Sequence, residues 1–248
     1  MKRVALAAGL ALALGLATGH ARALECTTET FEETRFDTCV VDSGSDELSL
    51  WWKGADDTPL QSLGALSDAL AADGKTLLFA MNAGMYHPDR SPVGHLIIDG
   101  EEHRRVITSA GPGNFGMLPN GVLCWGNGRA QIVESRAYAE DPPACRFATQ
   151  SGPMLVIGGK LHPRFLPDSD SRRIRNGAGV LADQSTLVFA LSRTPVTFHH
   201  FARFMRDHMN TRAALYLDGT ISRMYAPTLG RRDRGGRFGP ILGVVAPD

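Results

Sequence analysis

The chain of 248 residues has the length of one domain or of two small ones. With 43% hydrophobic and 21% charged residues it has the balance of a globular protein with a core, which excludes a coiled coil, a collagen-like chain and a charged disordered tail. The 26 basic and 26 acidic side chains cancel, which argues against a protein that binds nucleic acid through its phosphates.

The first 23 residues have the pattern of a secretory signal peptide. Lys2 and Arg3 precede an apolar run at 4–17, and Ala21-Arg22-Ala23 places small residues at the two positions that a signal peptidase recognises. The run is short for a bilayer span, so cleavage after Ala23 is favoured over a membrane anchor. We therefore expect an exported protein, periplasmic or secreted, without stable membrane insertion and with its domain in residues 24–248.

The cysteines agree with export. All four lie after the leader, at Cys26, Cys39, Cys124 and Cys145, and an even number in an exported chain predicts two disulfides. Three pairings are open, and Cys26–Cys39 with Cys124–Cys145 is preferred because it closes the shortest loops. No CxxC pair occurs, which argues against a zinc ribbon or a thioredoxin-type site.

Short strands and tight turns are predicted along most of the domain. Strands at 36–41 and 47–52 are joined by Ser-Gly-Ser and are expected to form a hairpin, and a buried strand is expected at 76–81. Four dipeptides between apolar runs predict sharp turns that lead from one strand to the next: Asp99-Gly100, Asn127-Gly128, Gly158-Gly159 and Asp218-Gly219.

Helices are expected to be few. Apolar spacing predicts one at 60–72 and a second at 196–208. Because strands and helices do not alternate, a doubly wound parallel sheet is not expected. The predicted fold is a single α+β domain with an antiparallel or mixed sheet and many hairpins.

Common catalytic motifs are missing from the sequence. It contains no GxSxG, no Walker loop and no GxGxxG after a strand. His199, His200 and His208 suggest metal ligands, but only His200 and His208 can share a helix face, so an ordinary helix surface is the better interpretation. Ser151 has no local sign of a paired base, so a binding or turn role is favoured over a nucleophile.

Polar residues and glycines follow the ends of several predicted strands. Asn and Gln amides suit sugar hydroxyls, the Arg fork suits phosphate or carboxylate, and Gly permits close backbone approach. Each Asn-Gly or Asp-Gly alone is explained as a turn, but Arg175-Asn176-Gly177 is harder to explain in that way. Together the loops predict a carbohydrate or phosphosugar pocket.

Five motifs in this order resemble the phosphodiester glycosidase family. Each is weak alone, but their joint presence is specific, and the resemblance runs from about residue 39 to residue 245. It implies a hydrolase that cleaves a sugar 1-phosphodiester at the glycosidic C–O bond, without a cofactor. The motifs are Ala80-Met81-Asn82-Ala83-Gly84-Met85-Tyr86, Pro119-Asn120-Gly121-Val122, Ala148-Thr149-Gln150-Ser151-Gly152-Pro153-Met154-Leu155, Arg175-Asn176-Gly177 and Leu215-Tyr216-Leu217-Asp218-Gly219.

The resemblance supports these motifs as pocket residues, and leaving-group chemistry suggests their roles. A departing phosphate monoester is a stable anion, so a cation can replace the general acid that ordinary glycosides need. We assign that role to Arg175, the carboxylate that activates water or supports the oxocarbenium-like centre to Asp218, and a proton shuttle to His162. The residues expected to contact substrate are Asn82, Gly84, Asn120, Gln150, Ser151, Gly152, Asn176, Gly177 and Thr220.

Other interpretations stay open at this point. Asp218 is also explained as a hairpin-turn residue, and although the scheme requires no metal, Asp168, Asp170 or Asp218 could bind an ion. The protein as a whole could be a carbohydrate-binding module without turnover, or a metal-dependent phosphodiesterase that cuts the P–O bond. In each case the expected partner is a sugar phosphate, either a small molecule or a polysaccharide, and not a nucleic acid.

Overall fold

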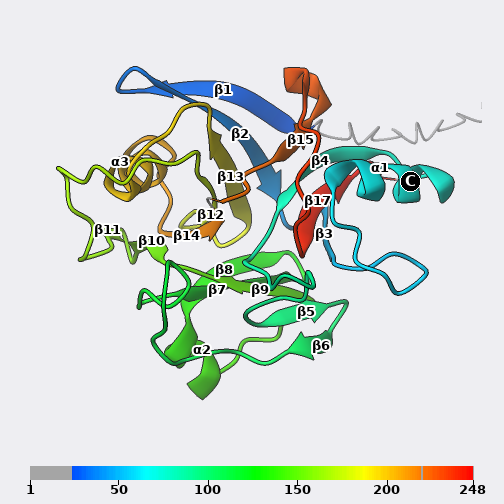
Figure 1. Cartoon of the computed structure of the whole chain (residues 1–248), viewed down its shortest axis with the longest axis horizontal. Helices are drawn as coiled ribbons and strands as arrows, with labels where there is room; N and C mark the ends of the chain where they lie inside the picture. Colours follow the sequence, from blue (N-terminus) through cyan, green and yellow to red (C-terminus); the bar gives the residue numbers. More distant parts are fainter. Residues whose placement is uncertain (1–23, 219, 248) are drawn as a thin grey trace, which may run out of the picture.

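Three antiparallel sheets form the framework of the protein, and its helices lie at the periphery (Figure 1). The computed structural model describes residues 24–218 and 220–247, so the expected signal peptide at 1–23 lies outside the described residues. Within the described part every pairing between named strands is antiparallel. The expected α+β domain with few helices is confirmed, and its sheets are antiparallel rather than mixed.

The largest sheet has seven strands and carries two of the expected site residues at one end. Asn176 begins β12 and lies opposite Asp218, the last residue of β14. In spatial order the strands are β1 (Glu25–Phe31), β2 (Thr34–Asp42), β13 (Thr186–Ser192), β12 (Asn176–Val180), β14 (Ala213–Asp218), β10 (Met154–Ile157) and β11 (Lys160–Leu161).

The other two sheets have five strands each. The second sheet contains, in spatial order, β16 (Arg231–Arg232), β15 (Met224–Ala226), β4 (Leu77–Asn82), β17 (Ile241–Val245) and β3 (Glu47–Trp51). The third contains β6 (Glu101–Arg104), β5 (Leu96–Ile98), β9 (Phe147–Ser151), β7 (Gly121–Gly126) and β8 (Arg129–Glu134).

Both predicted helices form, and a third short one occurs. In α1 (Leu63–Ala72) the Ser62 side chain caps the start by accepting from the Ala65 N–H, and three leucines at helical spacing are buried. The second predicted helix is α3 (Phe198–Arg203), which continues as the π-helical turn η1 (Phe204–His208). The remaining helical segments are α2 (Ser135–Glu140) and the 3₁₀ turn η2 (Pro227–Leu229).

The buried faces of the three sheets share one main apolar core. It includes large aromatic side chains from all three sheets, such as Phe79, Phe147 and Phe189. A second cluster packs α3 onto the seven-stranded sheet, where the rings of Phe36 and Phe204 stack with centroids 3.8 Å apart. Burying such a side chain contributes about 1.5–3 kcal/mol, so these clusters fix how the strand ends lie relative to one another.

Three predicted hairpins are confirmed and two are wrong. Gly158-Gly159 joins β10 to β11, which pair antiparallel. Asp99 and Asn127 have φ values of 50° and 52°, as the tight turns between β5 and β6 and between β7 and β8 require. By contrast, β2 joins the seven-stranded sheet, whereas β3 pairs with β17 in another sheet. Likewise β14 pairs with β12 and β10, whereas the strand after it, β15, pairs with β4. In both failures burial against distant strands decided the partner, and the local turn residues did not.

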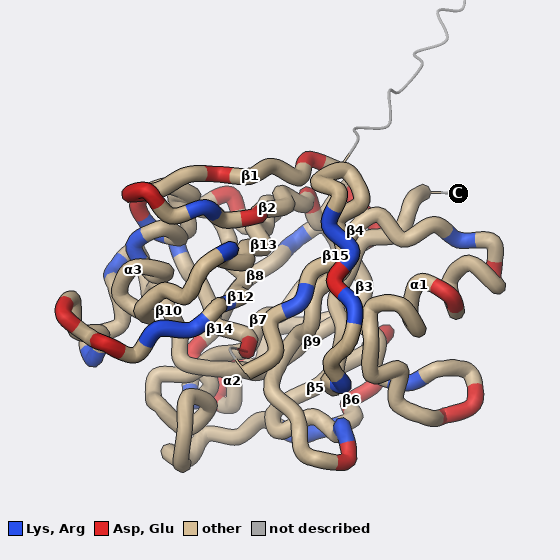
Figure 2. Tube along the Cα trace, turned by 45° about the horizontal axis from the view of Figure 1, so that its top comes forward, with Lys and Arg blue, Asp and Glu red and all other residues tan. Residues whose placement is uncertain are grey.

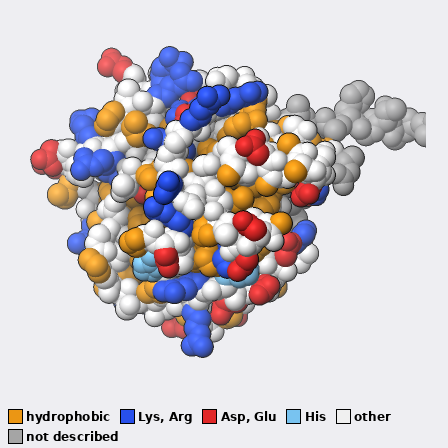
Figure 3. All heavy atoms as spheres, turned by 45° about the vertical axis from the view of Figure 1, so that its right-hand side comes forward, with side chains coloured by type: hydrophobic (Ala, Val, Ile, Leu, Met, Phe, Trp, Pro, Cys, Tyr) orange, Lys and Arg blue, Asp and Glu red, His pale blue; other side chains and the backbone are white. Residues whose placement is uncertain are grey.

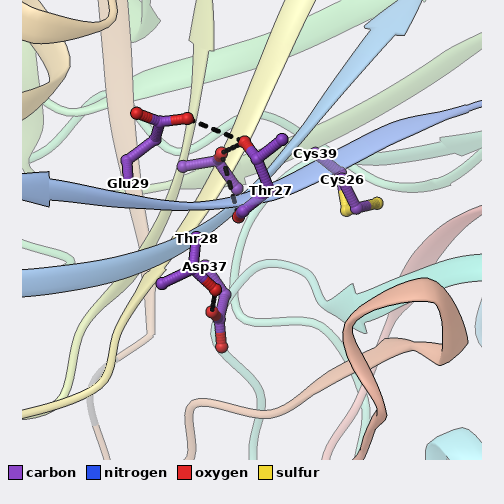
Figure 4. Close-up of a disulfide and its surroundings, with 7 residues drawn as sticks. Cys26, Thr27, Thr28, Glu29, Asp37 and Cys39 are labelled. Carbon is purple, nitrogen blue, oxygen red and sulfur yellow. Dashed lines mark hydrogen bonds between the residues drawn. A yellow bond between two sulfur atoms is a disulfide. The ribbon is translucent and has the colours of Figure 1, made fainter.

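Both expected disulfides are present. The first joins Cys26 to Cys39, which lie directly opposite each other on β1 and β2 (Figure 4). The second joins Cys124 of β7 to Cys145, which lies shortly before β9. Among the described residues no cysteine is free, and no helix has the length and apolar character needed to cross a membrane.

Candidate active site

Polar side chains from all three sheets meet where β4, β9, β12 and β14 have their ends. The Asn176 side-chain N–H₂ donates to the backbone oxygen of Asn82 at 3.0 Å and to its Oδ1 at 3.1 Å, which links the first sheet to the second. The Ser151 hydroxyl, at the end of β9, donates to the Leu217 carbonyl at 2.7 Å and links the third sheet to the first. We refer to this place as the three-sheet junction.

Asp218 lies at the junction with two tyrosines near it. Its backbone N–H donates to Asn176 Oδ1 at 2.9 Å, and its own Oδ1 accepts from the Thr220 N–H at 2.9 Å. Burial raises the pKa of Tyr86 and of Tyr216, and the negative charge of Asp218 raises both further. The charge of Asp218 therefore acts on both phenols, and the residue is only 7% exposed.

Asn82 presents an unused hydrogen-bond donor at the junction. Its Oδ1 accepts from Asn176 Nδ2 and, at 2.9 Å, from the Arg223 backbone N–H. Its Nδ2 is buried and has no hydrogen-bond partner among the described residues. A buried amide donor without a partner costs free energy, so this group is suited to a ligand oxygen or a water molecule.

Arg175 is more enclosed than a ligand-binding arginine is expected to be. The residue is 1% exposed, and its guanidinium lies 3.6 Å over the Phe198 ring. Nε donates to the Val196 carbonyl at 2.9 Å and Nη2 to the Ser171 carbonyl at 3.0 Å. Burial lowers the pKa of the guanidinium. Only Nη1 lacks a well-formed hydrogen bond, so much of this side chain holds two loops together.

Tyr216 is a neighbour of Arg175 that the sequence analysis did not single out. Its ring is fully buried and lies edge-on to Phe198, with centroids 4.7 Å apart. Its hydroxyl makes no well-formed hydrogen bond, and burial raises the pKa of Tyr216 to about 12. Tyr216 lies two residues before Asp218 on β14, the strand that ends at the junction, and that closeness in sequence is the signal that could have identified it.

Gln150 is a structural residue, which corrects the expectation that its amide contacts substrate. Its Oε1 accepts from the N–H groups of His95 and Ile107, at 3.0 and 2.9 Å. Its Nε2 donates to the Ile107 carbonyl and the Ser135 hydroxyl, at 2.6 and 2.8 Å. These four bonds use the whole hydrogen-bonding capacity of the amide, so none is left for a sugar.

The expected site glycines allow close packing of backbone at the junction. A Cβ on Gly84 would lie 2.5 Å from the Gln150 carbonyl oxygen, and one on Gly152 would lie 2.6 Å from the Asn120 Cβ. A Cβ on Gly177 would lie 2.8 Å from the Leu215 carbonyl oxygen. These positions require glycine because the neighbouring strands and loops leave no space for a side chain.

Asn120 and Thr220 complete the set of expected binding residues. Asn120 is fully buried, donates from Nδ2 to the Phe115 carbonyl at 2.8 Å, and keeps an Oδ1 without a partner. Thr220 is exposed and contributes its backbone N–H to the Asp218 side chain. Asn120 therefore has acceptor capacity left, whereas Thr220 contributes a backbone N–H that binds the Asp218 side chain.

His162 lies at the far end of a row of aromatic rings. Its ring stacks on Phe165 at 4.7 Å, Phe165 stacks on Phe198 at 5.1 Å, and Phe198 meets Tyr216. Burial lowers the pKa of His162, whose Nε2 has no hydrogen-bond partner in the described part of the chain. The structure thus connects His162 to Arg175 and Tyr216 through packing, and two phenylalanine rings stand between it and Tyr216.

The other candidate metal-binding residues do not form a cluster. Asp168 and Asp170 are exposed in the segment before β12. His200 and His208 each pack near Phe31, with their ring centroids 5.5 and 5.9 Å from the centroid of its ring. Over residues 24–218 and 220–247, no group of three or more His, Cys, Asp or Glu side chains is placed to hold a metal ion.

Comparison with known sequences shows the family. Residues 75–238 match the sequence model of the phosphodiester glycosidase family. The uncharacterized protein YigE of Escherichia coli K12 is 33% identical over 186 residues, which are 75% of this chain and 72% of YigE. The chain therefore belongs to the phosphodiester glycosidase family.

Comparison with solved structures shows that the fold is shared. The catalytic domain of zebrafish N-acetylglucosamine-1-phosphodiester alpha-N-acetylglucosaminidase, auto-inhibited by its pro-peptide, superposes with a TM-score of 0.60 at 13% identity. That match covers 91% of this chain and 84% of the zebrafish chain. A hypothetical protein from Synechocystis matches with a TM-score of 0.59 at 13% identity, over 90% of this chain but only 62% of the other.

Proposed function

We propose that the protein is an exported hydrolase that cleaves the glycosidic C–O bond of a sugar 1-phosphodiester. The observation that carries this proposal is the three-sheet junction, where Asn176 holds both Asp218 and Asn82 and where Asn82 Nδ2 has no partner in the described residues, inside a chain of the phosphodiester glycosidase family. A carboxylate suits a developing positive charge at the anomeric carbon, and amide groups suit sugar hydroxyls and phosphate oxygens.

The proposed reaction needs one carboxylate and a stabilised leaving group. As the anomeric C–O bond breaks, its electron pair departs with the oxygen of the phosphate monoester. Water attacks the anomeric carbon and gives its proton to Asp218, which also stabilises the oxocarbenium-like centre. A phosphate monoester has a second pKa near 6, so it leaves as an anion without a strong general acid.

The buried groups around Asp218 receive supporting roles in this proposal. Asn176 positions Asp218, because its Oδ1 holds the Asp218 backbone and its Nδ2 holds Asn82. Asn82 Nδ2 and Asn120 Oδ1 are the amide groups with capacity left for substrate. Arg175 contributes its positive charge and its remaining Nη1 donor to the phosphate side.

The first test combines a substitution with an isotope label. Asp218→Asn keeps the side-chain oxygen that caps the Thr220 N–H but removes the charge and the base, so turnover should fall by at least about 100-fold with little change in melting temperature. The matched control is Asp183→Asn, because Asp183 also accepts from nearby N–H groups in a turn, at Ser185 and Thr186, but lies elsewhere.

The label identifies the bond that breaks. In water enriched with heavy oxygen, cleavage of the C–O bond places the label in the sugar. Label in the phosphate would instead identify a phosphodiesterase, and binding without turnover over a broad panel of sugar phosphates would identify a binding module. Near-normal hydrolysis by a folded Asp218→Asn protein would show that Asp218 has only a structural role.

Export forms part of the same proposal. It is supported by the signal-peptide pattern of residues 1–23 and by the two disulfides, which form in oxidising compartments. Mass analysis of protein recovered from the expressing bacterium's cell envelope or medium should find a chain that begins at Leu24 with no free thiol. An intact leader, or four reduced cysteines, would contradict export.

A further inference from the structure

Arginines gather in the segment that follows the candidate catalytic strand. Residues 223–237 include five arginines and one acidic residue, Asp233, although the formal net charge of the whole chain is zero. We call residues 231–237 the arginine segment. In Figure 2 it is the blue run beside β15 that one red stretch interrupts. Figure 3 shows basic side chains in a row along the top of this side of the molecule, away from the acidic ones at lower right.

One arginine of the segment anchors it. Arg231 pairs with the fully buried Asp37 of β2 and also donates to Asp233 Oδ2, from Nε at 3.1 Å and Nη2 at 2.9 Å. Asp233 additionally accepts from the Met224 N–H at 3.0 Å. Both nearby acids are therefore engaged.

The other three arginines of the segment remain in solvent. Arg232, Arg234 and Arg237 are exposed, and none forms an ion pair with an acidic side chain in the described residues. Arg232 instead lies with its guanidinium 5.9 Å from the centre of the Tyr225 ring. Like charges held this close repel one another, and a bound anion relieves that repulsion.

The arginine segment meets the candidate active site at both of its ends. At the first end, Arg232 lies opposite Tyr225 in the β15–β16 pair. Tyr225 is two residues from Arg223, whose N–H binds Asn82, a distance of about 7 Å along an extended chain. At the second end the segment leads to Gly239, where a Cβ would lie 2.6 Å from the Tyr86 Cβ. The segment is therefore linked to Asn82 of the three-sheet junction through Tyr225 and Arg223, and to Tyr86 through Gly239.

A cavity of about 600 Å³ opens between the arginine segment and the start of α1. Arg232 and Arg234 line one side of it, and Ser62 and Ser67 line the other. Asp68 is a further acidic residue in its wall, besides the engaged Asp233. Arginine forks and hydroxyls are donors that suit phosphate oxygens, and a concave site suits a discrete group better than it suits a flat membrane.

We propose that Arg232 and Arg234 bind a second phosphate group of the same substrate molecule. The substrate class is then a multiply phosphorylated glycan, whose scissile linkage lies at Asp218 and whose neighbouring phosphate lies in the cavity beside α1. This inference rests on the proposed function, since it places the second phosphate relative to a cleaved sugar phosphodiester.

The experiment compares two substrates of the mature protein. One is a sugar 1-phosphodiester of a small uncharged alcohol, and the other carries two further phosphate-bearing units on the alcohol side. In the double variant Arg232→Gln/Arg234→Gln, the ratio of kcat/KM for the second substrate to kcat/KM for the first should fall about tenfold or more. The change should appear in KM, because two charge-assisted contacts with the substrate are lost. The matched control, Arg104→Gln/Arg105→Gln, changes two exposed arginines in and after β6 and should keep the wild-type ratio.

A binding measurement gives a readout that does not depend on turnover. Inorganic tripolyphosphate should bind Asp218→Asn protein in calorimetry, more weakly at higher salt because screening reduces the attraction. Adding Arg232→Gln and Arg234→Gln should abolish that binding, and adding Arg104→Gln and Arg105→Gln should not.

The outcomes separate the two proposals. Turnover of both substrates with the same ratio in wild type and Arg232→Gln/Arg234→Gln overturns the second phosphate site and leaves the glycosidase intact. No turnover of either substrate overturns the glycosidase and with it the assignment of the substrate, even where tripolyphosphate binds. Arginine-dependent binding to vesicles of phosphatidylglycerol without any effect on the kinetic ratio would assign the segment to a membrane surface and overturn the inference.

Discussion

Two groups of arginines in this protein lie in contrasting surroundings, one enclosed and one exposed. Arg175 is enclosed, stacked on Phe198 and bound to two backbone carbonyls. Arg232 and Arg234 are exposed beside a cavity and have no acidic partner in the described residues. An arginine whose donors are engaged by the backbone mainly maintains the fold, whereas an exposed and unpaired one is available to an anion.

The comparison changes what Arg175 is expected to do. The sequence predicts that Arg175 stabilises the departing phosphate, because a cation can replace the general acid that ordinary glycosides need. The structure shows that Nε and Nη2 are already used, which leaves Nη1 and the overall charge. The arginine segment, which no motif in the sequence marks as a site, is a more accessible positive surface than Arg175.

Substitution of Asp37, the buried partner of Arg231, is expected to disturb the arginine segment most. Asp37 is fully buried between Arg193, whose Nε donates at 2.8 Å, and Arg231, and it also accepts from Thr28 at 2.7 Å (Figure 4). Asp37→Asn leaves the partly buried Arg193 without its acidic partner and leaves Arg231 with Asp233 alone, so the free energy of unfolding should fall by about 3 kcal/mol. Denaturant titration measures this loss.

The pH dependence of the same variant tests the cause. Burial works against the charge of Asp37, but hydrogen bonds from Thr28, Arg231 and Arg193 outweigh it and lower the pKa of the carboxyl. Its contribution is therefore present above the unfolded-state pKa of about 3.9 and is lost as pH falls through the folded-state value. The difference between wild type and Asp37→Asn should shrink from pH 7 toward pH 3, and a constant difference would assign the loss to packing.

Arg175→Lys tests the enclosed side with a smaller expected effect on stability. Lysine keeps the charge but cannot reach the Val196 and Ser171 carbonyls with a planar fork. The loss of two buried hydrogen bonds should lower the free energy of unfolding by about 2 kcal/mol. Turnover of the folded variant should also fall by about tenfold or more. Unchanged turnover in a folded Arg175→Lys protein would remove Arg175 from the reaction.

Tyr216→Phe has the smallest expected effect on stability. It tests whether the neighbour of Arg175 takes part in the reaction as well as Arg175 itself. The change removes a hydroxyl that makes no well-formed hydrogen bond and keeps the ring contact with Phe198. The free energy of unfolding should change by less than about 1 kcal/mol. A fall in turnover comparable with that of Arg175→Lys would show that the hydroxyl also contacts substrate, and activity assays on both variants side by side decide this.

Local features of the fold were predictable and distant pairings were not. Asn127-Gly128 specifies its turn through left-handed backbone angles, which is information within four residues. Sheet membership of β3 depends on β17, almost two hundred residues later, and Ser-Gly-Ser carries no information about that partner. The expected 36–41/47–52 hairpin therefore failed although both strands are present.

The candidate site, like the fold, was predictable only where the signal lies in neighbouring residues of the sequence. Asn82, Asn176 and Asp218 were found because polar residues at strand ends are visible in the sequence, and the structure brings them together. Gln150 looked identical to them, since nothing local shows that His95, Ile107 and Ser135 engage its amide. Burial of Arg175 was equally hidden, because it comes from Phe198, which lies more than twenty residues further along the chain.

The position of β17 in the second sheet has a consequence for folding kinetics. This strand lies between β4 and β3, is buried along its whole length, and pairs residues 241–245 with residues 77–82 and 47–51. Pairings between such distant segments make folding slow, because a long loop must close before the contacts form. The second sheet cannot close around β4 until β17 arrives, so a chain interrupted before residue 241 would expose the apolar edge of β4 and be prone to aggregation.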